Sequence, residues 1–114
     1  MSAGTAAVRE DALRLIEFAS GLAQRPLPER IAAQAKRCLL DTLGCGLFGA
    51  SQPWSAIMAD EVYADGSQGP CTVLGHARTA AAVPAALANG TAVHGFELDD
   101  VIPSALVHPG TVIV

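Results

Sequence analysis

Residues 40–50 read LDTLGCGLFGA, and this stretch decides how the chain can fold. Its apolar side chains recur at helical spacing and continue the periodic pattern of the preceding dozen residues. Gly44, Gly46 and Gly49 each weaken a helix by about 1 kcal/mol relative to alanine. Glycines so placed allow another backbone to approach closely. We therefore expect a central helix that begins near Pro28 and is crossed over its C-terminal half.

The composition favours the same kind of architecture. Hydrophobic residues make up 51% of the 114 residues and aromatic residues only 4%, so the apolar content is mostly alanine, leucine and valine. Small side chains fill a core only where elements approach closely, which favours packed helices over a β-sandwich. The length allows one domain at most, or part of one. We predict an all-α fold with about four to five helices and one short extended segment.

The remaining elements follow from apolar periodicity and from helix breakers. A first helix is expected from Asp11 to about Gln24, and residues 1–8 are expected to be disordered. The other expected elements are a helix from Trp54 to about Ala64, an extended segment at residues 71–74, a helix from about Ala80 to His94 capped by Thr79, and a helix start at His108-Pro109.

Charge and cysteine content exclude several classes of function. The formal net charge is −4, Lys36 is the only lysine and the six arginines are scattered, so no basic stripe marks a nucleic-acid partner. An anionic membrane surface is excluded as a partner for the same reason. The cysteines, Cys38, Cys45 and Cys71, are odd in number and irregularly spaced, which fits no disulfide framework, zinc ribbon or iron–sulfur site.

No stretch of the chain has the pattern of a targeting or membrane segment. Charged residues at positions 9–11 precede any apolar core, which argues against a signal peptide. Two stretches, residues 42–59 and 79–96, lack charge, but proline interrupts both and neither is leucine-rich. We expect a cytoplasmic protein without a membrane partner.

Residues 88–100 read ANGTAVHGFELDD, and His108-Pro109-Gly110 follows. Two histidines and three carboxylates thus fall within 15 residues of an otherwise apolar region. Charged groups are costly to bury unless they are paired or used, so the cluster is a candidate reaction site. On a continued helix His94 and Glu97 would share a face, as a general acid–base pair would require. The alternative is a helix end with solvated acids, although acids there oppose the helix dipole.

His108 has the position of a helix start, with proline in the first turn. The positive end of the dipole there favours the uncharged imidazole that a general base needs; the alternative is a loop histidine without function. His94, Glu97, Asp99 and His108 are also possible metal ligands. However, the His-x-x-Glu order lacks the second histidine of a zincin helix and reverses the Glu-x-x-His of di-iron bundles. We therefore predict no metal ion.

These residues resemble the MmgE/PrpD family, which includes 2-methylcitrate dehydratase, cis-aconitate decarboxylase and iminodisuccinate epimerase. The match lies in residues 40–44 with Gly49-Ala50, in residues 73–75, in residues 88–100 and in His108-Pro109. Order and spacing fit along nearly the whole chain, and the Asn-Gly…His…Glu-x-Asp-Asp…His-Pro series is the most specific part.

The resemblance implies a large all-helical domain built from both ends of a longer chain, with a smaller α+β lid between them. Residues 1–114 would be the N-terminal part of that domain and would be inactive alone. The resemblance also implies cofactor-independent homodimers that act on di- and tricarboxylates. The expected partners are therefore a small polycarboxylate and either a second copy or the remainder of the fold.

The resemblance also assigns roles within the candidate site. Glu97 and His108 would line the active site as catalytic residues, with His108 as the acid or base and Glu97 orienting or sharing its proton. Asp99, Asp100 and His94 would bind substrate or shape the site. The expected chemistry is removal of a proton next to a carboxylate or carbonyl, with loss or relocation of a leaving group.

Two departures bear on the reaction type. The decarboxylase branch tends to have aspartate in place of Glu97 and threonine in place of Val101. The presence of Glu97 and Val101 in this chain therefore favours a dehydratase or a related isomerase, for example one acting on 2-methylcitrate in propionate catabolism. The alternative from another class is a non-catalytic helical interaction module or a decayed gene product. The apolar ending at residues 112–114 favours a truncated enzyme over such a module.

Overall fold

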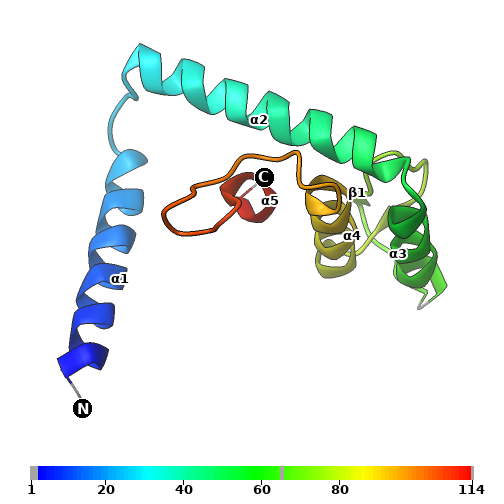
Figure 1. Ribbon diagram of the computed structural model, residues 1–114, viewed down its shortest axis with the longest axis horizontal. Coiled ribbons are helices and arrows are strands. Elements are labelled where there is room, and N and C mark those ends of the chain that lie inside the picture. The colour runs from blue at the N-terminus through cyan, green and yellow to red at the C-terminus, as the bar shows by residue number, and fades with distance from the viewer. Residues whose placement is uncertain (1–2, 65, 114) are drawn as a thin grey trace. The chain divides into compact units, whose positions relative to one another are not determined.

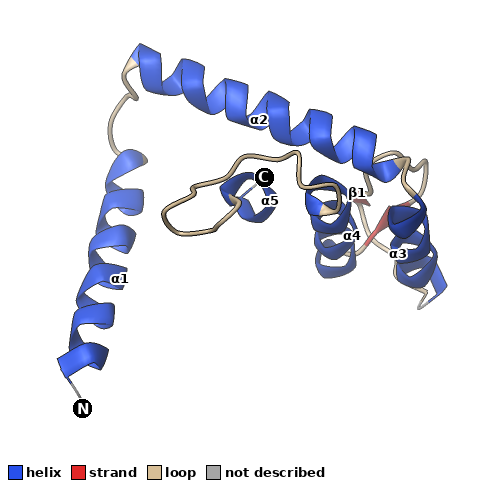
Figure 2. Cartoon of the chain, in the orientation of Figure 1, coloured by secondary structure: helices blue, strands red, loops and turns tan. Residues whose placement is uncertain are grey.

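The computed structural model describes residues 3–64 and 66–113, and these residues are mainly helical (Figure 1, Figure 2). The elements in chain order are α1 (Ala3–Leu22), α2 (Glu29–Ala50), α3 (Pro53–Ala64), β1 (Cys71–Thr72), β2 (Thr79–Ala80), α4 (Ala82–His94) and α5 (Pro109–Ile113). The predicted mostly helical fold is confirmed.

The chain divides into two compact units, one over residues 1–34 and one over residues 35–114. The first unit contains α1, which begins at Ala3 rather than at Asp11. The expected disorder of residues 1–8 stays a prediction. Residues 1–2 lie outside the described part of the chain.

In the second unit the C-terminal half of α2 crosses close to α4 (Figure 1). Gly46 and Gly49 are both buried in the C-terminal half of α2. A Cβ atom on Gly49 would overlap the carbonyl group of Ala92, and one on Gly46 would meet the side chains of Leu74 and Val93. The predicted crossing is therefore confirmed, and it depends on the absence of side chains at these two glycines.

The sequence prediction missed the two-stranded sheet. Cys71 pairs with Ala80 and Thr72 with Thr79 in antiparallel register. Thr79, expected to cap the following helix, is a strand residue instead. Helix α4 begins after Ala81, which makes no side-chain capping bond. A strand of two residues is too short to show the alternating apolar pattern by which strands are recognised, so this pairing could not be predicted from the sequence.

Asn89 fixes α4 against the segment that follows β1. Its side-chain Nδ2 donates a hydrogen bond to the carbonyl oxygen of Thr72 at 3.0 Å, and its Oδ1 accepts one from the backbone N–H of Leu74 at 2.8 Å. The amide thereby satisfies one backbone group in the last residue of β1 and one in the segment just after it. This contact positions α4, and with it His94 at the C-terminal end of the helix.

The core of the second unit consists of small residues. Its buried cluster contains alanines and valines: Val62, Val73, Ala80, Ala85 and Ala88. Among the described residues no large side chain is fully buried, whereas Val83, Val112 and Ile113 are 80% exposed or more. Apolar surface of this extent marks a face suited to contact with further polypeptide. In the described ranges no helix is both long enough and apolar enough to cross a membrane.

Candidate functional site

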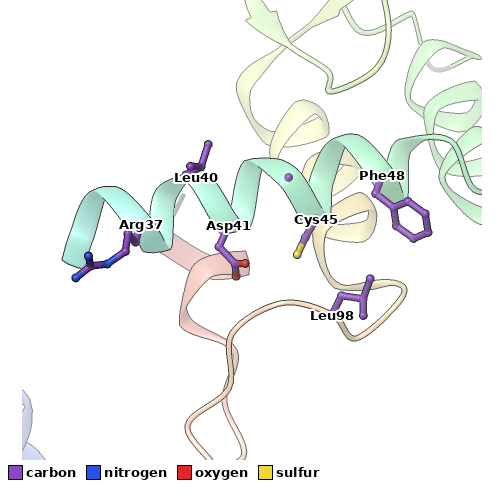
Figure 3. Close-up of a pocket in the computed structure, with 7 residues that line it drawn as sticks. Arg37, Leu40, Asp41, Cys45, Phe48 and Leu98 are labelled. Carbon is purple, nitrogen blue, oxygen red and sulfur yellow. The ribbon is translucent and has the colours of Figure 1, made fainter. Parts of the chain in front are cut away.

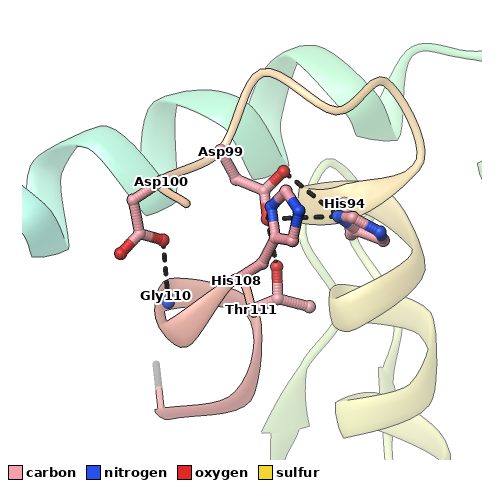
Figure 4. Close-up of polar contacts among 6 residues, drawn as sticks. All are labelled: His94, Asp99, Asp100, His108, Gly110 and Thr111. Carbon is pink, nitrogen blue, oxygen red and sulfur yellow. Dashed lines mark hydrogen bonds and ion pairs between the residues drawn. The ribbon is translucent and has the colours of Figure 1, made fainter. Parts of the chain in front are cut away.

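The acid–histidine cluster of the sequence folds around the carboxylate of Asp99 (Figure 4). His94 is the last residue of α4, Asp99 lies in the loop that follows, and His108 directly precedes α5. The side chain of Asp99 is completely buried, while those of His94 and His108 are 42% and 27% exposed. Three separate segments therefore meet at one buried negative charge with a partly open side.

The two histidines approach the same carboxylate through the same ring atom. Nδ1 of His94 lies 3.2 Å from Oδ1 and 3.3 Å from Oδ2 of Asp99. Nδ1 of His108 lies 3.2 Å from Oδ2. The two imidazole rings stand edge to face with centroids 4.4 Å apart. The hydroxyl of Thr111 donates to Oδ2 at 2.6 Å and fixes the orientation of the carboxylate.

Asp99 carries its negative charge at neutral pH. Burial raises the pKa of this carboxyl, but hydrogen bonds from Thr111, from His94 and from the backbone outweigh burial and hold the pKa below its ordinary value. A buried carboxylate beside an imidazole orients the ring and stabilises the imidazolium that forms when the ring takes a proton. The cluster can therefore perform general acid–base chemistry.

His108 is the less satisfied of the two histidines. Its Nδ1 is within ion-pair distance of Asp99, yet this buried nitrogen makes no hydrogen bond. Buried polar atoms are almost always hydrogen-bonded, so an exception in a compact cluster indicates either strain or a functional role.

Asp100 has a different task from that of Asp99. Its Oδ1 accepts a hydrogen bond at 2.8 Å from the backbone N–H of Gly110 in the first turn of α5 (Figure 4). The carboxylate thus caps the helix and fixes the segment that carries His108. A Cβ atom on Gly110 would collide with Thr42 and with Asp100 itself, so this turn requires glycine. The predicted helix start with Pro109 in its first turn is confirmed.

Glu97 lies outside the cluster. Helix α4 ends at His94, and the backbone N–H of Glu97 donates to the carbonyl oxygen of His94 at 2.8 Å in a turn. Glu97 has φ 53°, in the left-handed region, and its side chain is exposed. The expectation that His94 and Glu97 share a helical face is therefore wrong, because the helix stops before that face can continue. An acidic residue held at positive φ is nevertheless an outlier of the kind found at functional sites.

The structure thus assembles His94, Asp99 and His108, places Asp100 under the neighbouring helix, and leaves Glu97 facing solvent. Thr111 was missed by the sequence analysis. No local pattern marks it, because the contact of its hydroxyl with Asp99 depends on how the loop returns to α5. The donor atoms of His94, Asp99 and His108 lie within 4.8 Å of one another and are the described residues able to hold a metal ion together.

Aromatic contacts fix the loop before Asp99. The ring of Phe96 stands edge to face with Phe48, with centroids 5.1 Å apart, and stacks on Trp54 at 6.2 Å. Phe96 therefore ties the loop to the end of α2 and to α3, which holds the adjacent residues in place.

A shallow groove runs along α2 beside this loop (Figure 3). It is lined by Arg37, Leu40, Asp41, Gly44, Cys45, Phe48 and Leu98. Asp41 and Cys45 point from the helix towards the loop that carries Leu98. Burial, and then the nearby negative charges of Asp41, Asp99 and Asp100, raise the pKa of the Cys45 thiol. Cys45 is therefore a protonated thiol at neutral pH and a poor nucleophile.

Comparison with known proteins gives the family. A sequence model of the MmgE/PrpD N-terminal domain matches residues 13–114. The cis-aconitate decarboxylase-like protein oryM of Aspergillus oryzae (strain ATCC 42149 / RIB 40) is 32% identical over 100 residues, which cover 88% of this chain and 21% of that protein. Cis-aconitate decarboxylase of Aspergillus terreus is 29% identical over 100 residues, covering 88% of this chain and 20% of that protein.

The chain spans about a fifth of the length of these curated relatives. No solved structure matches it. The family match nevertheless extends over α2 to α5 and includes every residue of the acid–histidine cluster. The chain belongs to the MmgE/PrpD family.

Proposed function

We propose that this chain forms the N-terminal part of a lyase that acts on small di- or tricarboxylates by general acid–base proton transfer. The observation that carries the proposal is the buried carboxylate of Asp99, 3.2 Å from Nδ1 of His94 and 3.2 Å from Nδ1 of His108. A carboxylate in contact with imidazole is the arrangement that general acid–base catalysis uses to direct a histidine.

His108 is the proposed acid or base. Asp99 acts through it as a positioning residue, since Asp99 is too buried to touch a substrate. Asp100 positions the same histidine by capping α5, the helix that begins directly after His108. Glu97 is exposed on the loop between the two histidines, so its carboxyl is free to meet a ligand that arrives from solvent. Its proposed role is to assist proton transfer to the leaving group.

The proposed reaction is a dehydration. The base removes a proton from the carbon next to a carboxylate, an acid protonates the leaving hydroxyl, and water departs as the double bond forms. Glu97 and Val101 support dehydration, of 2-methylcitrate in propionate catabolism for example. The relatives named as cis-aconitate decarboxylases support a lyase of the same broad type and make decarboxylation the competing reaction.

A polycarboxylate substrate requires cations to bind it and to stabilise the enolate-like transition state. None of the described contacts of the Asp99 cluster involves lysine or arginine. We propose that further polypeptide supplies these cations, either the remainder of the family fold or a second copy in a homodimer. On this proposal the 114 residues are inactive alone and the complete protein works in the cytoplasm without a cofactor.

The test uses the protein expressed from the complete reading frame that encodes this chain. The protein is incubated in D2O with 2-methylcitrate, citrate or cis-aconitate, and products and carbon–deuterium exchange are followed by NMR. Turnover or exchange with at least one tricarboxylate is expected, and a His108→Gln variant should abolish both. Absence of turnover and exchange with every tricarboxylate tested contradicts the proposal.

The exposed apolar side chains favour a second candidate, a non-catalytic helical interaction module. Val112 is 84% exposed and Ile113 is 80% exposed, next to the candidate site itself. A module of this kind would bind a protein partner through that face and ignore tricarboxylates. Thermal melting separates the two candidates, because a ligand that binds only the folded site raises the melting temperature of the complete protein.

A further inference from the structure

The spacing of these residues in the sequence led to a prediction of no metal ion, but in the structure His94, Asp99 and His108 have the composition of a metal site as well as that of an acid–base site. We propose that these three side chains form a two-histidine, one-carboxylate site that binds a divalent transition-metal ion of the zinc class. The proposal concerns binding by this chain and does not depend on which substrate the complete protein uses.

The donor atoms are of the right kind and are close to the right spacing. Imidazole nitrogen and carboxylate oxygen are the donors that Zn²⁺ and its neighbours prefer in mixed sites. Two ligands of a tetrahedral zinc ion with bonds of about 2.0 Å stand about 3.3 Å apart. Oδ2 of Asp99 lies 3.3 Å from Nδ1 of His94 and 3.2 Å from Nδ1 of His108. Two of the three separations therefore already match.

The third separation is that between the two histidine nitrogens. One donor atom from each of the three residues lies within 4.8 Å of the other two, so the two histidine nitrogens have to approach each other by up to about 1.5 Å to reach the spacing of about 3.3 Å. Because the histidine side chains are 42% and 27% exposed, their rings have room to rotate. The same exposure gives an ion a path to the buried carboxylate and leaves space for water as a fourth ligand.

The unpaired Nδ1 of His108 is a second observation that supports metal binding. Its Nδ1 is buried, has no hydrogen-bond partner and faces a carboxylate oxygen at 3.2 Å. In an uncharged ring with the proton on the other nitrogen, this lone pair would face a negative oxygen and be repelled by it. A cation between the two atoms removes that repulsion and binds the lone pairs of both. The ring does not have the straight N–H···O geometry that a hydrogen bond needs, but a metal ion does not require it.

The surroundings hold the ligands in the way metal sites require. Ligating carboxylates are usually oriented by a hydrogen bond from a neighbouring group, and Thr111 supplies one to Oδ2 of Asp99 at 2.6 Å. Asp100 fixes the first turn of α5 through Gly110 and so limits the movement of His108. Metal binding would occupy Nδ1 of His108 and the carboxylate of Asp99, and the proposed acid–base reaction needs these two groups in direct contact. Zn²⁺ is therefore expected to inhibit the proposed reaction.

The experiment titrates the metal-free, reduced chain with Zn²⁺ by calorimetry and with Co²⁺ by visible absorption. One Zn²⁺ is expected per chain, and the Co²⁺ complex should show tetrahedral bands without the charge transfer of a thiolate. Substitutions His94→Gln, Asp99→Asn and His108→Gln should each weaken binding by roughly 100-fold, since loss of a ligand costs at least as much as loss of a supporting partner. His76→Gln, which removes the only other histidine, should leave binding unchanged.

Circular dichroism of each variant shows whether the chain is still folded, and three ligand variants ensure that at least one informative protein is tested. Cys45→Ser tests whether the thiol that feels the charge of Asp99 is a ligand instead. Absence of saturable Zn²⁺ binding overturns the proposal. Equal Zn²⁺ affinity in the folded ligand variants and in His76→Gln also overturns it. So does a thiolate charge-transfer band in the Co²⁺ spectrum that disappears in Cys45→Ser. The assay contains no substrate, so failure of the proposed lyase activity leaves its result unaffected.

Discussion

Asp99 and His108 are nine positions apart in the sequence, yet the carboxylate of one lies 3.2 Å from Nδ1 of the other. The contact is made because the chain leaves α4 at His94, returns through a loop and starts α5 directly after His108. The buried charge therefore stands at the junction of two helices. Its removal should alter both the stability of this junction and the chemistry of the histidines.

Asp99→Asn should destabilise the chain at neutral pH by about 1–3 kcal/mol, because a charge-assisted buried contact is lost. The pKa of Asp99 is lowered in the folded state, so its charged form stabilises the protein well above the ordinary carboxyl pKa of 3.8. That stabilisation disappears as the pH falls through the folded pKa. Urea unfolding at neutral pH and at about pH 3 should therefore show a difference between wild type and variant that shrinks on acidification.

Glu97→Gln is the matched control for that prediction. Its side chain is exposed, so neutralising it should change stability by less than about 0.5 kcal/mol at either pH. A difference between wild type and Asp99→Asn that stays constant with pH would contradict the role assigned to the Asp99 charge.

Gly49→Ala should destabilise the chain by about 1–3 kcal/mol or more, because the new methyl group would overlap the carbonyl of Ala92 and push α4 from α2. Gly44→Ala, on the same helix, meets nothing within 4 Å. It should be neutral or stabilise the chain by up to about 1 kcal/mol through helix propensity. Thermal melting of both variants tests the crossing, and equal melting temperatures would exclude it.

Asp100→Ala should cost about 0.5–2 kcal/mol, the usual value for a lost helix cap. Asp100→Asn should restore most of that stability, because asparagine also accepts a hydrogen bond from the N–H of Gly110. Urea midpoints of the two variants measure the effect. If the asparagine variant is as unstable as the alanine variant, Asp100 acts through its charge and the capping role is wrong.

The sequence predicted those features that local chemistry determines. The glycines of α2 indicated the helix crossing because only residues without side chains allow such an approach. Pro109 indicated the start of α5 because proline fits a first helical turn. The clustering of acids and histidines indicated the site, since charge in an apolar region needs a partner.

What the sequence could not provide was the path of the chain after His94. Glu97 adopts a left-handed conformation that an acidic residue rarely takes. The prediction that the helix continues past His94 therefore placed Glu97 on the same face as His94. Which of three neighbouring acids becomes buried depends on that turn. The choice of Asp99, and the hydroxyl of Thr111 that orients it, followed only from tertiary structure. The two-residue strands were missed because each is too short to carry a pattern.

The most direct test of the account is the turnover of tricarboxylates by the complete protein carrying His108→Gln, with His76→Gln as the control. His76 lies beside Tyr63, with ring centroids 6.1 Å apart, and makes none of the contacts of the Asp99 cluster. A general acid or base contributes about 100-fold or more to rate, so kcat should fall by at least that factor in His108→Gln and stay within about twofold in His76→Gln. If His108→Gln retains the wild-type kcat, the acid–base role of the Asp99–His108 pair is wrong.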